Sequence, residues 1–475
     1  MKNRRGLLQL EGLTERIVPA VSIRAMDGDL VISGIANTVA TKQHLEITVT
    51  GNNQVNIIDG TTARGVYAVT GDLKLNLSNR NDEVTINFTG DFSLDGSVIA
   101  NLNNGNDTIA ITNSGGVGEI FGDVIVDGGN GTDSLTINNT GATTDELTVY
   151  GQVTFNGGSG IDVFNLNSAT TTGTQDLFVG NGLTLTRVNT VSIGTGATEN
   201  VNISGNVTIN SSADKIISNT TNIGTSAVNI SGALVVTGGQ GGDSITLDTV
   251  TIVDVIPAED TVLEIVMSLD RGSNTLTVTD SEFGAAGTDA DFSYAGTTGA
   301  DTINFGGGGN FVSGNATFAL GNGANSYTGD SAGNQFDADV TITGGNNNDN
   351  IDFDADTVGG LLTLNLGKAD LVGNIFNSNG LLDGGLTYIG TSGKDTITLT
   401  DGDNLQGDVS IDVGSGADSI TISGTTSVGA TSLIVNLGND SVIDTFLYDN
   451  DFDTLITLLN EGVTPTGDPD VVTSV

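Results

Sequence analysis

Aspartates at a recurring position are the residues of this sequence whose type and spacing could do chemistry. Each follows a Gly- or Asn-rich turn and precedes a stretch in which apolar and polar residues alternate. The clearest are Asp107, Asp133, Asp162, Asp243, Asp301, Asp349, Asp395 and Asp418. If successive copies stack, their carboxylates lie about 5 Å apart, where like charges repel unless they are hydrated, protonated or bridged by a cation.

Carboxylate and carbonyl oxygens are the ligands that calcium prefers, so we take these eight aspartates as candidate calcium ligands, with calcium as the only cofactor we expect. The alternative is that each aspartate side chain caps its own turn by accepting hydrogen bonds from backbone N–H groups. The residue types alone leave both interpretations open.

The segments between the aspartates predict the elements that position them. After each aspartate, apolar residues recur at every second position, as in Ile109 and Ile111 or Ile397 and Leu399, which is typical of half-buried strands. A second strand commonly precedes the turn, as at 124–126 and 409–411. Glycine and asparagine supply the turns.

The spacing predicts coils of about 21–29 residues and hence an all-β fold, a single-stranded parallel β-helix (β-solenoid). Right-handedness follows from general chirality. In the last third we expect Asp301, Asn325, Asp349, Asp370, Asp395, Asp418 and Asp440 at equivalent positions. Between 162 and 243 the pattern loses its glycines and its register loosens.

Three regions are expected along the chain. Residues 1–21 form an export or targeting segment, residues 22–445 the solenoid, and residues 446–475 a C-terminal cap with an acidic tail. An acidic start and a glycine stop predict a short helix over 453–462 that covers the last coil, and residues 21–50 are expected to cover the first.

The composition excludes several function classes. The net charge of −43 argues against nucleic acid and anionic membrane surfaces as partners, and no apolar run is long enough to span a bilayer. The chain has no cysteine and a single histidine, His44, so cysteine nucleophiles and Cys/His zinc sites are excluded.

Catalysis on polysaccharides is the alternative function, because parallel β-helices often host hydrolases and lyases. The Asp-Asp pair and Gly-His-Gly of the polygalacturonase-like signature are absent, and the sparse basic residues do not form the cluster that a lyase needs. We therefore expect no enzymatic activity. Thr-x-Thr strands such as 341–343 and 396–398 suggest a flat threonine array as in ice-binding solenoids, although their register shifts from coil to coil.

Two motifs resemble known families. Residues 10–20, LEGLTERIVPA after a basic start, resemble the N-terminal LExLExR motif of secreted or surface proteins of planctomycete-type bacteria. The alternative is an ordinary leader. The strings GGNGTDSLT, GGSGIDVFN and GGQGGDSIT resemble the RTX nonapeptide GGxGxDxUx, which implies calcium binding, but here the copies stand apart instead of in tandem.

These features together predict an exported, non-catalytic structural or adhesive protein of the bacterial cell surface or extracellular matrix. Its expected partners are cell-surface or matrix components, including further copies of the chain, with no nucleic acid and no membrane span of its own.

Overall fold

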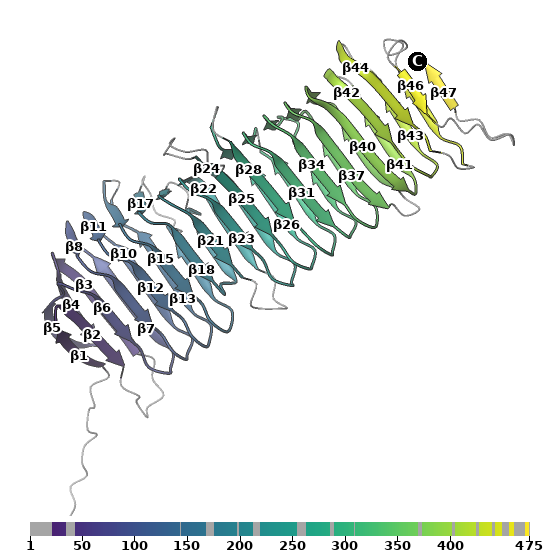
Figure 1. Ribbon diagram of the computed structural model, residues 1–475. Coiled ribbons are helices and arrows are strands. Elements are labelled where there is room, and N and C mark those ends of the chain that lie inside the picture. The colour runs from purple at the N-terminus through teal and green to yellow at the C-terminus, as the bar shows by residue number, and fades with distance from the viewer. Residues whose placement is uncertain are drawn as a thin grey trace, which may run out of the picture.

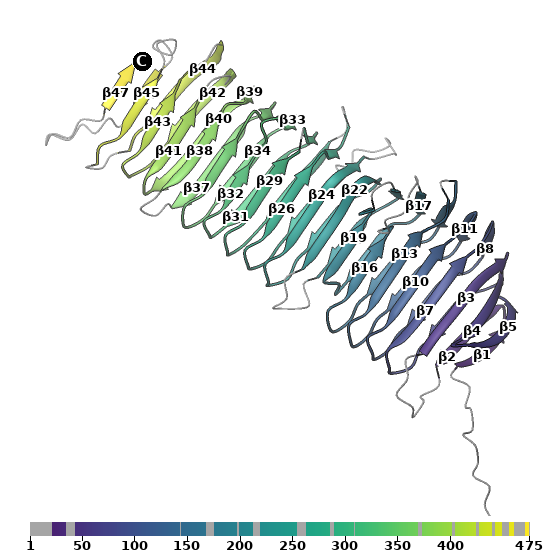
Figure 2. The same cartoon turned by 180° about the vertical axis from the view of Figure 1, so that it is seen from behind.

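The computed structural model describes residues 21–34, 43–142, 144–167, 175–196, 199–211, 219–253, 263–285, 289–307, 309–368, 373–400, 404–423, 427–438, 442–448, 456–459 and 471–474. The described regular elements are all strands, and they stack into an elongated parallel β-solenoid (Figures 1 and 2). The predicted fold class is confirmed. No helix among the described residues has the length and apolar composition that crossing a membrane requires.

Each coil from β7 to β44 contributes one strand or half-strand to each of three faces, which we call A, B and C in chain order. In the coil that starts at Asp107 these are β10 (Thr108–Asn113), β11 (Val117–Ile120) and β12 (Val124–Asp127). β10 pairs in parallel with its equivalents in the preceding and following coils, and β11 and β12 do the same on their faces.

Face A consists of β3 (Gln43–Gly51), β7 (Asp82–Phe88), β10, β13 (Ser134–Asn139), β16 (Val163–Leu166), β19 (Thr190–Ile193), the first halves of β22 (Thr220–Ile230) and β24 (Ser244–Ile252), β26 (Thr275–Thr279), β29 (Thr302–Gly306), β32 (Ser326–Thr328), β35 (Asn350–Phe353), β38 (Asn374–Ser378), β41 (Asp395–Leu399), β43 (Ser419–Ile422), β45 (Thr445–Tyr448) and β47 (Val471–Ser474).

Face B consists of β8 (Phe92–Leu94), β11, β14 (Glu146–Val149), β17 (Gln175–Val179), β20 (Glu199–Ile203), the second halves of β22 and β24, β27 (Glu282–Phe283), β30 (Phe311–Val312), β33 (Gln335–Phe336), β36 (Thr357–Val358), β39 (Leu381–Leu382) and the first halves of β42 (Asn404–Asp412) and β44 (Ser427–Asn436).

Face C consists of β2 (Asp29–Gly34), β6 (Leu73–Asn76), β9 (Val98–Asn101), β12, β15 (Val153–Asn156), β18 (Leu183–Thr186), β21 (Val207–Asn210), β23 (Leu234–Thr237), β25 (Leu263–Ser268), β28 (Ala290–Ala295), β31 (Ala316–Gly321), β34 (Val340–Gly344), β37 (Leu362–Lys368), β40 (Gly385–Ser392), the second halves of β42 and β44, and β46 (Ile456–Leu459).

The inward residues of the three faces form one narrow apolar core. Alternating residues such as Ile109 and Ile111 are fully buried, and their polar neighbours lie outward. In the C-terminal half the core contains a column of aromatic rings with neighbouring centroids 4.7–6.4 Å apart, from Phe283 to Tyr388. Since one coil alone buries little apolar area, this stacking is what stabilises the fold.

The register does not loosen between 162 and 243, contrary to the sequence prediction. β16, β19, β22 and β24 pair in order, with one irregularity between Gly224 and Val228. Coil lengths vary from 21 to 31 residues, slightly beyond the expected range. The extra residues lie in the connections, so the strands stay in register.

The two ends differ from each other. At the N-terminal end β1 (Val21–Met26) pairs antiparallel with β2, while β4 (Gln54–Asp59) pairs with β3 and β5 (Thr62–Ala68) with β4, so the antiparallel cover extends beyond residue 50. At the other end the predicted helix over 453–462 is wrong in its described part. Ile456–Leu459 is strand β46, paired with β44, because its apolar residues continue face C. Part of the predicted tail is strand β47, paired with β45.

The threonine array is only partly regular. On face C, Thr341 lies in register with Thr363 and Thr387. Its partner Thr343 lies beside Asn365, which pairs in turn with Ile389, so the Thr-x-Thr pair is not repeated in successive coils.

Candidate functional site

The corner between faces C and A holds all eight predicted aspartates. We call it the anchor corner, and its residues the anchors, one per coil. Its residues in chain order are Asp82, Asp107, Asp133, Asp162, Asn189, Asn219, Asp243, Asn274, Asp301, Asn325, Asp349, Asn374, Asp395, Asp418 and Asp444. The anchors are at most 4% exposed.

The anchors connect successive coils through their side chains. The backbone N–H of Asp82 donates to Oδ1 of Asp107 at 2.6 Å, and that of Asp107 donates to Oδ1 of Asp133 at 2.9 Å. The pattern repeats along the solenoid up to Asp444, except at Asn189, whose side-chain amide donates to Asn219 Oδ1 while its backbone N–H donates to the carbonyl of Asp162. Since the chain turns here, these N–H groups would otherwise be buried without an acceptor. The observed bonds correspond to the capping alternative: the aspartates cap the preceding coil, and Asp82 and Asp243 also cap their own turns by accepting the N–H groups of Ser78 and Gly239 at 3.0 Å.

Asparagine fills the positions where the sequence pattern was lost. The N–H of Asp162 donates to Oδ1 of Asn189 at 2.9 Å, and Asn274 continues the series between Asp243 and Asp301. An amide oxygen accepts the same bond as a carboxylate oxygen. Sequence reasoning missed these anchors because their turns lack the full glycine-rich cassette, although each is followed by the same alternating strand.

Two of the expected anchor positions are wrong. The coils that were expected to use Asp370 and Asp440 use Asn374 and Asp444, since Asn374 accepts from Asp349 and Asp444 from Asp418. Asp370 and Asp440 themselves lie outside the described residues.

Two glycine positions of the cassette are explained by close contacts at this corner. The glycine two residues before the anchor lies against the carbonyl group of the equivalent glycine in the previous coil. Gly131 has φ +138°, and a Cβ on it would lie 1.4 Å from the carbonyl oxygen of Gly105. The glycine five residues before the anchor faces the carboxyl group. A Cβ on Gly344 would lie 1.9 Å from Oδ2 of Asp349. A Cβ would therefore collide at Gly131 and at Gly344, whereas other coils carry Arg187 and Asn347 two residues before their anchors.

Burial governs the ionisation of the anchors. It raises the pKa of Asp107 to about 7 and that of Asp133 to about 6, and the neighbouring anchor carboxyls act in the same direction. Burial likewise raises the pKa of Asp349 to about 7, although hydrogen bonds from Asn325 oppose the shift. The second oxygen, Oδ2, of these three residues is buried without a hydrogen-bond partner.

Tyrosine hydroxyls lie beside two of the anchors. Tyr294 and Tyr388, both on face C, interact with Asp301 and Asp395, which partly offsets the rise that burial causes in the pKa of both carboxyls. Both tyrosines stand seven residues before their anchor, a spacing visible in the sequence but indistinguishable there from ordinary core packing.

The anchors differ in their neighbours along the solenoid. From Asn219 to Asp395, asparagine and aspartate alternate strictly, and the Asn325 amide donates to Asp349 Oδ1 at 2.9 Å. Runs of consecutive aspartates occur at both ends, from Asp82 to Asp162 and from Asp395 to Asp444. In these runs a carboxyl has carboxyls on both sides, so like-charge repulsion favours protonation.

A calcium cage needs six to eight oxygens, several of them free to turn toward the ion. Among the described residues no group of three or more acidic or histidine side chains is arranged to hold a metal. The Oδ1 atoms already accept backbone bonds, and Oδ2 of Asp349 faces Gly344. Calcium binding therefore stays a prediction from the sequence, with the capping alternative matching the observed hydrogen bonds.

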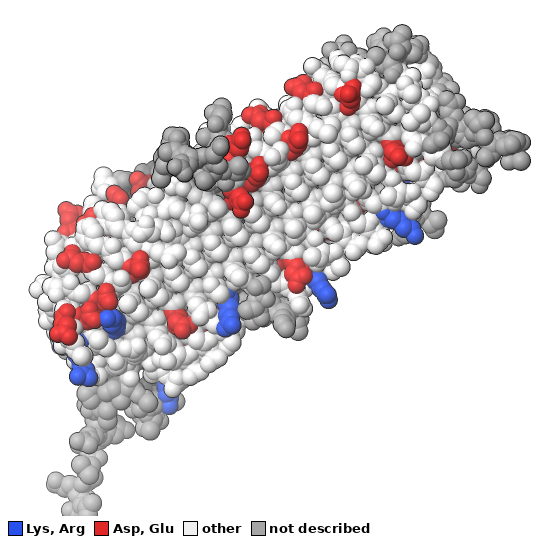
Figure 3. Space-filling model, viewed as in Figure 1, with Lys and Arg blue, Asp and Glu red and all other residues white. Residues whose placement is uncertain are grey.

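The surface charges are unevenly distributed. Arg80, Arg187, Arg271 and Lys394 all stand one to three residues before an anchor. Figure 3 shows Lys and Arg at intervals along one long edge, Asp and Glu more frequent toward the opposite edge, and scattered acidic residues on the broad face between them. His44 lies on β3 at the surface, with Nδ1 3.6 Å from Oε2 of Glu83.

Lys74 forms ion pairs with two carboxylates. Lys74 Nζ lies 2.5 Å from Asp29 Oδ2 and 3.2 Å from Asp72 Oδ2. Both aspartates also accept backbone N–H groups of the following coil, from Asp72 and Ser97, so they connect coils at the corner between faces B and C.

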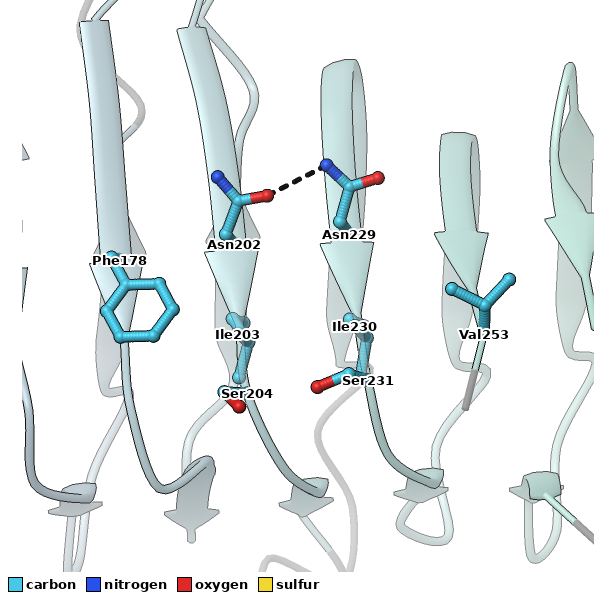
Figure 4. A pocket seen from close by; sticks show the side chains of 8 residues that line it. All are labelled: Phe178, Asn202, Ile203, Ser204, Asn229, Ile230, Ser231 and Val253. Carbon is cyan, nitrogen blue, oxygen red and sulfur yellow. Dashed lines mark hydrogen bonds between the residues drawn. The ribbon is translucent and has the colours of Figure 1, made fainter. Parts of the chain in front are cut away.

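A shallow groove of about 310 Å³ lies on face B (Figure 4). Phe178 stands at one end and Val253 at the other. Between them lie Asn202, Ile203 and Ser204 of one coil and Asn229, Ile230 and Ser231 of the next. The Asn229 amide donates to Asn202 Oδ1 at 2.9 Å, which aligns the two amides along the groove.

No protein-family model, curated protein or solved structure matches the chain.

Proposed function

We propose that this protein is an exported, non-catalytic structural or adhesive element of the bacterial cell surface or extracellular matrix. The observation that carries the proposal is the anchor corner. The recurring aspartates are the most regular candidates for chemistry in the chain. Their Oδ1 atoms accept hydrogen bonds from backbone N–H groups of neighbouring coils. Side chains used in this way hold successive coils together and so stabilise a rigid rod. The long faces of the rod are then available for contacts with surface or matrix components or with further copies of the chain.

Localisation tests the export part of the proposal. Antibody labelling of intact cells and of the separated culture medium should find the protein outside the cytoplasm. Protein confined to the cytoplasmic fraction would overturn it.

The alternative is a carbohydrate-active enzyme, and the Lys74 cluster is the observation that favours it. Two carboxylates beside a cation are the minimum for acid–base work on a sugar. We expect no release of reducing ends or unsaturated products from a panel of neutral polysaccharides and polyuronates. Turnover that is lost in the Lys74→Ala variant would establish the enzyme instead.

A further inference from the structure

A strip of outward residues runs along the solenoid where face B ends. Backbone hydrogen bonds establish its register. In each coil the N–H of the strip residue donates to a carbonyl of the previous coil, that of the residue just before the strip residue there. The donors are Phe121, Tyr150, Gly180, Ser204, Ser231 and Val253. The strip therefore includes three residues that line the groove: Ser204, Ser231 and Val253.

The first part of the strip is aromatic and exposed. Phe121 and Tyr150 are 47% and 42% exposed, and their rings stack at 4.9 Å with an interplanar angle of 3°. In the next coil the strip position is Gly180, and the half-buried Phe178 lies two residues before it, in register with Thr148. Exposed aromatic rings grouped in this way on a strongly acidic surface mark an interaction site better than scattered apolar residues do.

The groove beyond Phe178 is uncharged and mostly apolar, with Ile203 and Ile230 in its lining and polar groups on both sides of them. Asn202 and Asn229 present an amide pair, and Ser204 and Ser231 present hydroxyls one coil apart. Successive coils are about 4.8 Å apart. Donors and acceptors thus repeat along the rod axis beside an aromatic wall, within a volume that suits a small ligand.

The charges restrict the chemistry of that ligand. None of the eight lining residues is charged, whereas the whole chain carries −43. An anionic ligand is repelled by this chain. A cationic one finds no carboxylate in the groove lining, and Glu119 beside the aromatic pair already accepts a hydrogen bond from the Tyr150 hydroxyl at 2.9 Å. A neutral molecule with apolar ring faces and many hydroxyls satisfies both the aromatic rings and the amides.

We infer that the groove and the adjoining aromatic pair bind a neutral oligosaccharide laid along the rod axis. This inference rests on the proposed adhesive role and names its ligand class. Pyranose rings present C–H faces to Phe178 and to the outer sides of the stacked Phe121–Tyr150 pair, and their hydroxyls bond to the asparagine and serine rows.

Calorimetric titration of the full chain with neutral hexasaccharides of glucose, mannose and N-acetylglucosamine tests the inference, with an oligogalacturonate of equal length as the anionic probe. At least one neutral probe should bind. Phe178→Ala should weaken that binding about tenfold or more, and so should the double change Asn202→Ala and Asn229→Ala. Phe311→Ala is the matched control, because Phe311 occupies the same outward row of face B outside the groove; it should leave affinity within about twofold.

Three results would overturn the inference: no binding of any neutral probe, equal weakening by Phe311→Ala, or tighter binding of the oligogalacturonate. Thermal melting of each variant separates lost contacts from lost folding, and the asparagine variant provides the test if Phe178→Ala does not fold. Localisation is measured independently, so a rod found at the cell surface that binds no neutral probe defeats this inference and leaves the proposed function standing.

Discussion

Changing Asp107 to Asn should remove a pH-dependent loss of stability that the anchor corner imposes on the solenoid. Asp107 lies between the carboxyls of Asp82 and Asp133 and is 1% exposed. Asparagine keeps the oxygen that accepts the Asp82 N–H and cannot ionise. The chain itself uses asparagine at this position in other coils, so the change is compatible with the corner.

The sign follows from the raised pKa. Burial lifts the pKa of Asp107 from 3.8 to about 7. Below about pH 4 the carboxyl is protonated in both the folded and the unfolded chain, and its contribution to stability is fully present. As the pH rises toward 7, the unfolded chain releases its proton first, so the free energy of unfolding falls. The loss is complete above the folded pKa.

The magnitude follows from the interval between pH 5 and pH 7, at about 1.4 kcal/mol per pH unit. The free energy of unfolding of the wild-type chain should therefore fall by about 3 kcal/mol from this one carboxyl between pH 5 and pH 8. Asp133, with a pKa raised to about 6, should add about 1.4 kcal/mol in the same direction.

Urea unfolding followed by far-UV circular dichroism at pH 5, 6, 7 and 8 measures the effect. Asp107→Asn should be more stable than the wild type at pH 8 and close to it at pH 5. Glu264→Gln, on an exposed position of face C, changes the net charge equally and controls for general repulsion. If Asp107→Asn keeps the slope of the wild type and of Glu264→Gln, the carboxyl is ionised in the folded chain and the reasoning fails.

Three further experiments test the same corner. Gly131→Ala should lower the free energy of unfolding by about 2–3 kcal/mol or more, because the new Cβ would meet the Gly105 carbonyl at a positive φ. The control Gly306→Ala, with open space around it, should lower it by less than about 1 kcal/mol. Equal melting temperatures of the two variants would contradict the stacking. Asn325→Asp removes the amide donor to Asp349 and should destabilise the chain by about 1–3 kcal/mol at pH 8 with recovery at pH 5; a loss that persists at pH 5 would argue against the carboxyl repulsion. Melting in calcium and in chelator should give the same midpoint if the anchors act only as caps, whereas a clear rise in calcium would support the cage predicted from the nonapeptides.

The sequence was sufficient to predict the stacked coils, because period-two alternation after a turn leaves little choice of fold. It also placed eight aspartates at one corner. It failed where two residue types do the same work: Asn189 and Asn274 accept the same backbone bond as an aspartate, Asn219 accepts from the side-chain amide of Asn189, and only the neighbouring coils reveal these contacts.

The errors at the C-terminal end have another cause. The stretch around Ile456–Leu459 carries both helix-like end signals and strand-like apolar residues, and pairing with β44 decides between them. Such pairing is a tertiary interaction that local propensity does not contain. The groove was missed for the same reason, since Phe178, Asn202, Asn229 and Val253 are far apart in the sequence and meet only through the coil register.

A high-resolution crystal structure of the chain grown with calcium would test the central claim most directly. The account predicts Asp107, Asp133, Asp162 and Asn189 in one row, each Oδ1 accepting the N–H of the preceding anchor, with no ion between them. A cation bound between successive anchor carboxylates, or anchors displaced from this row, would contradict it.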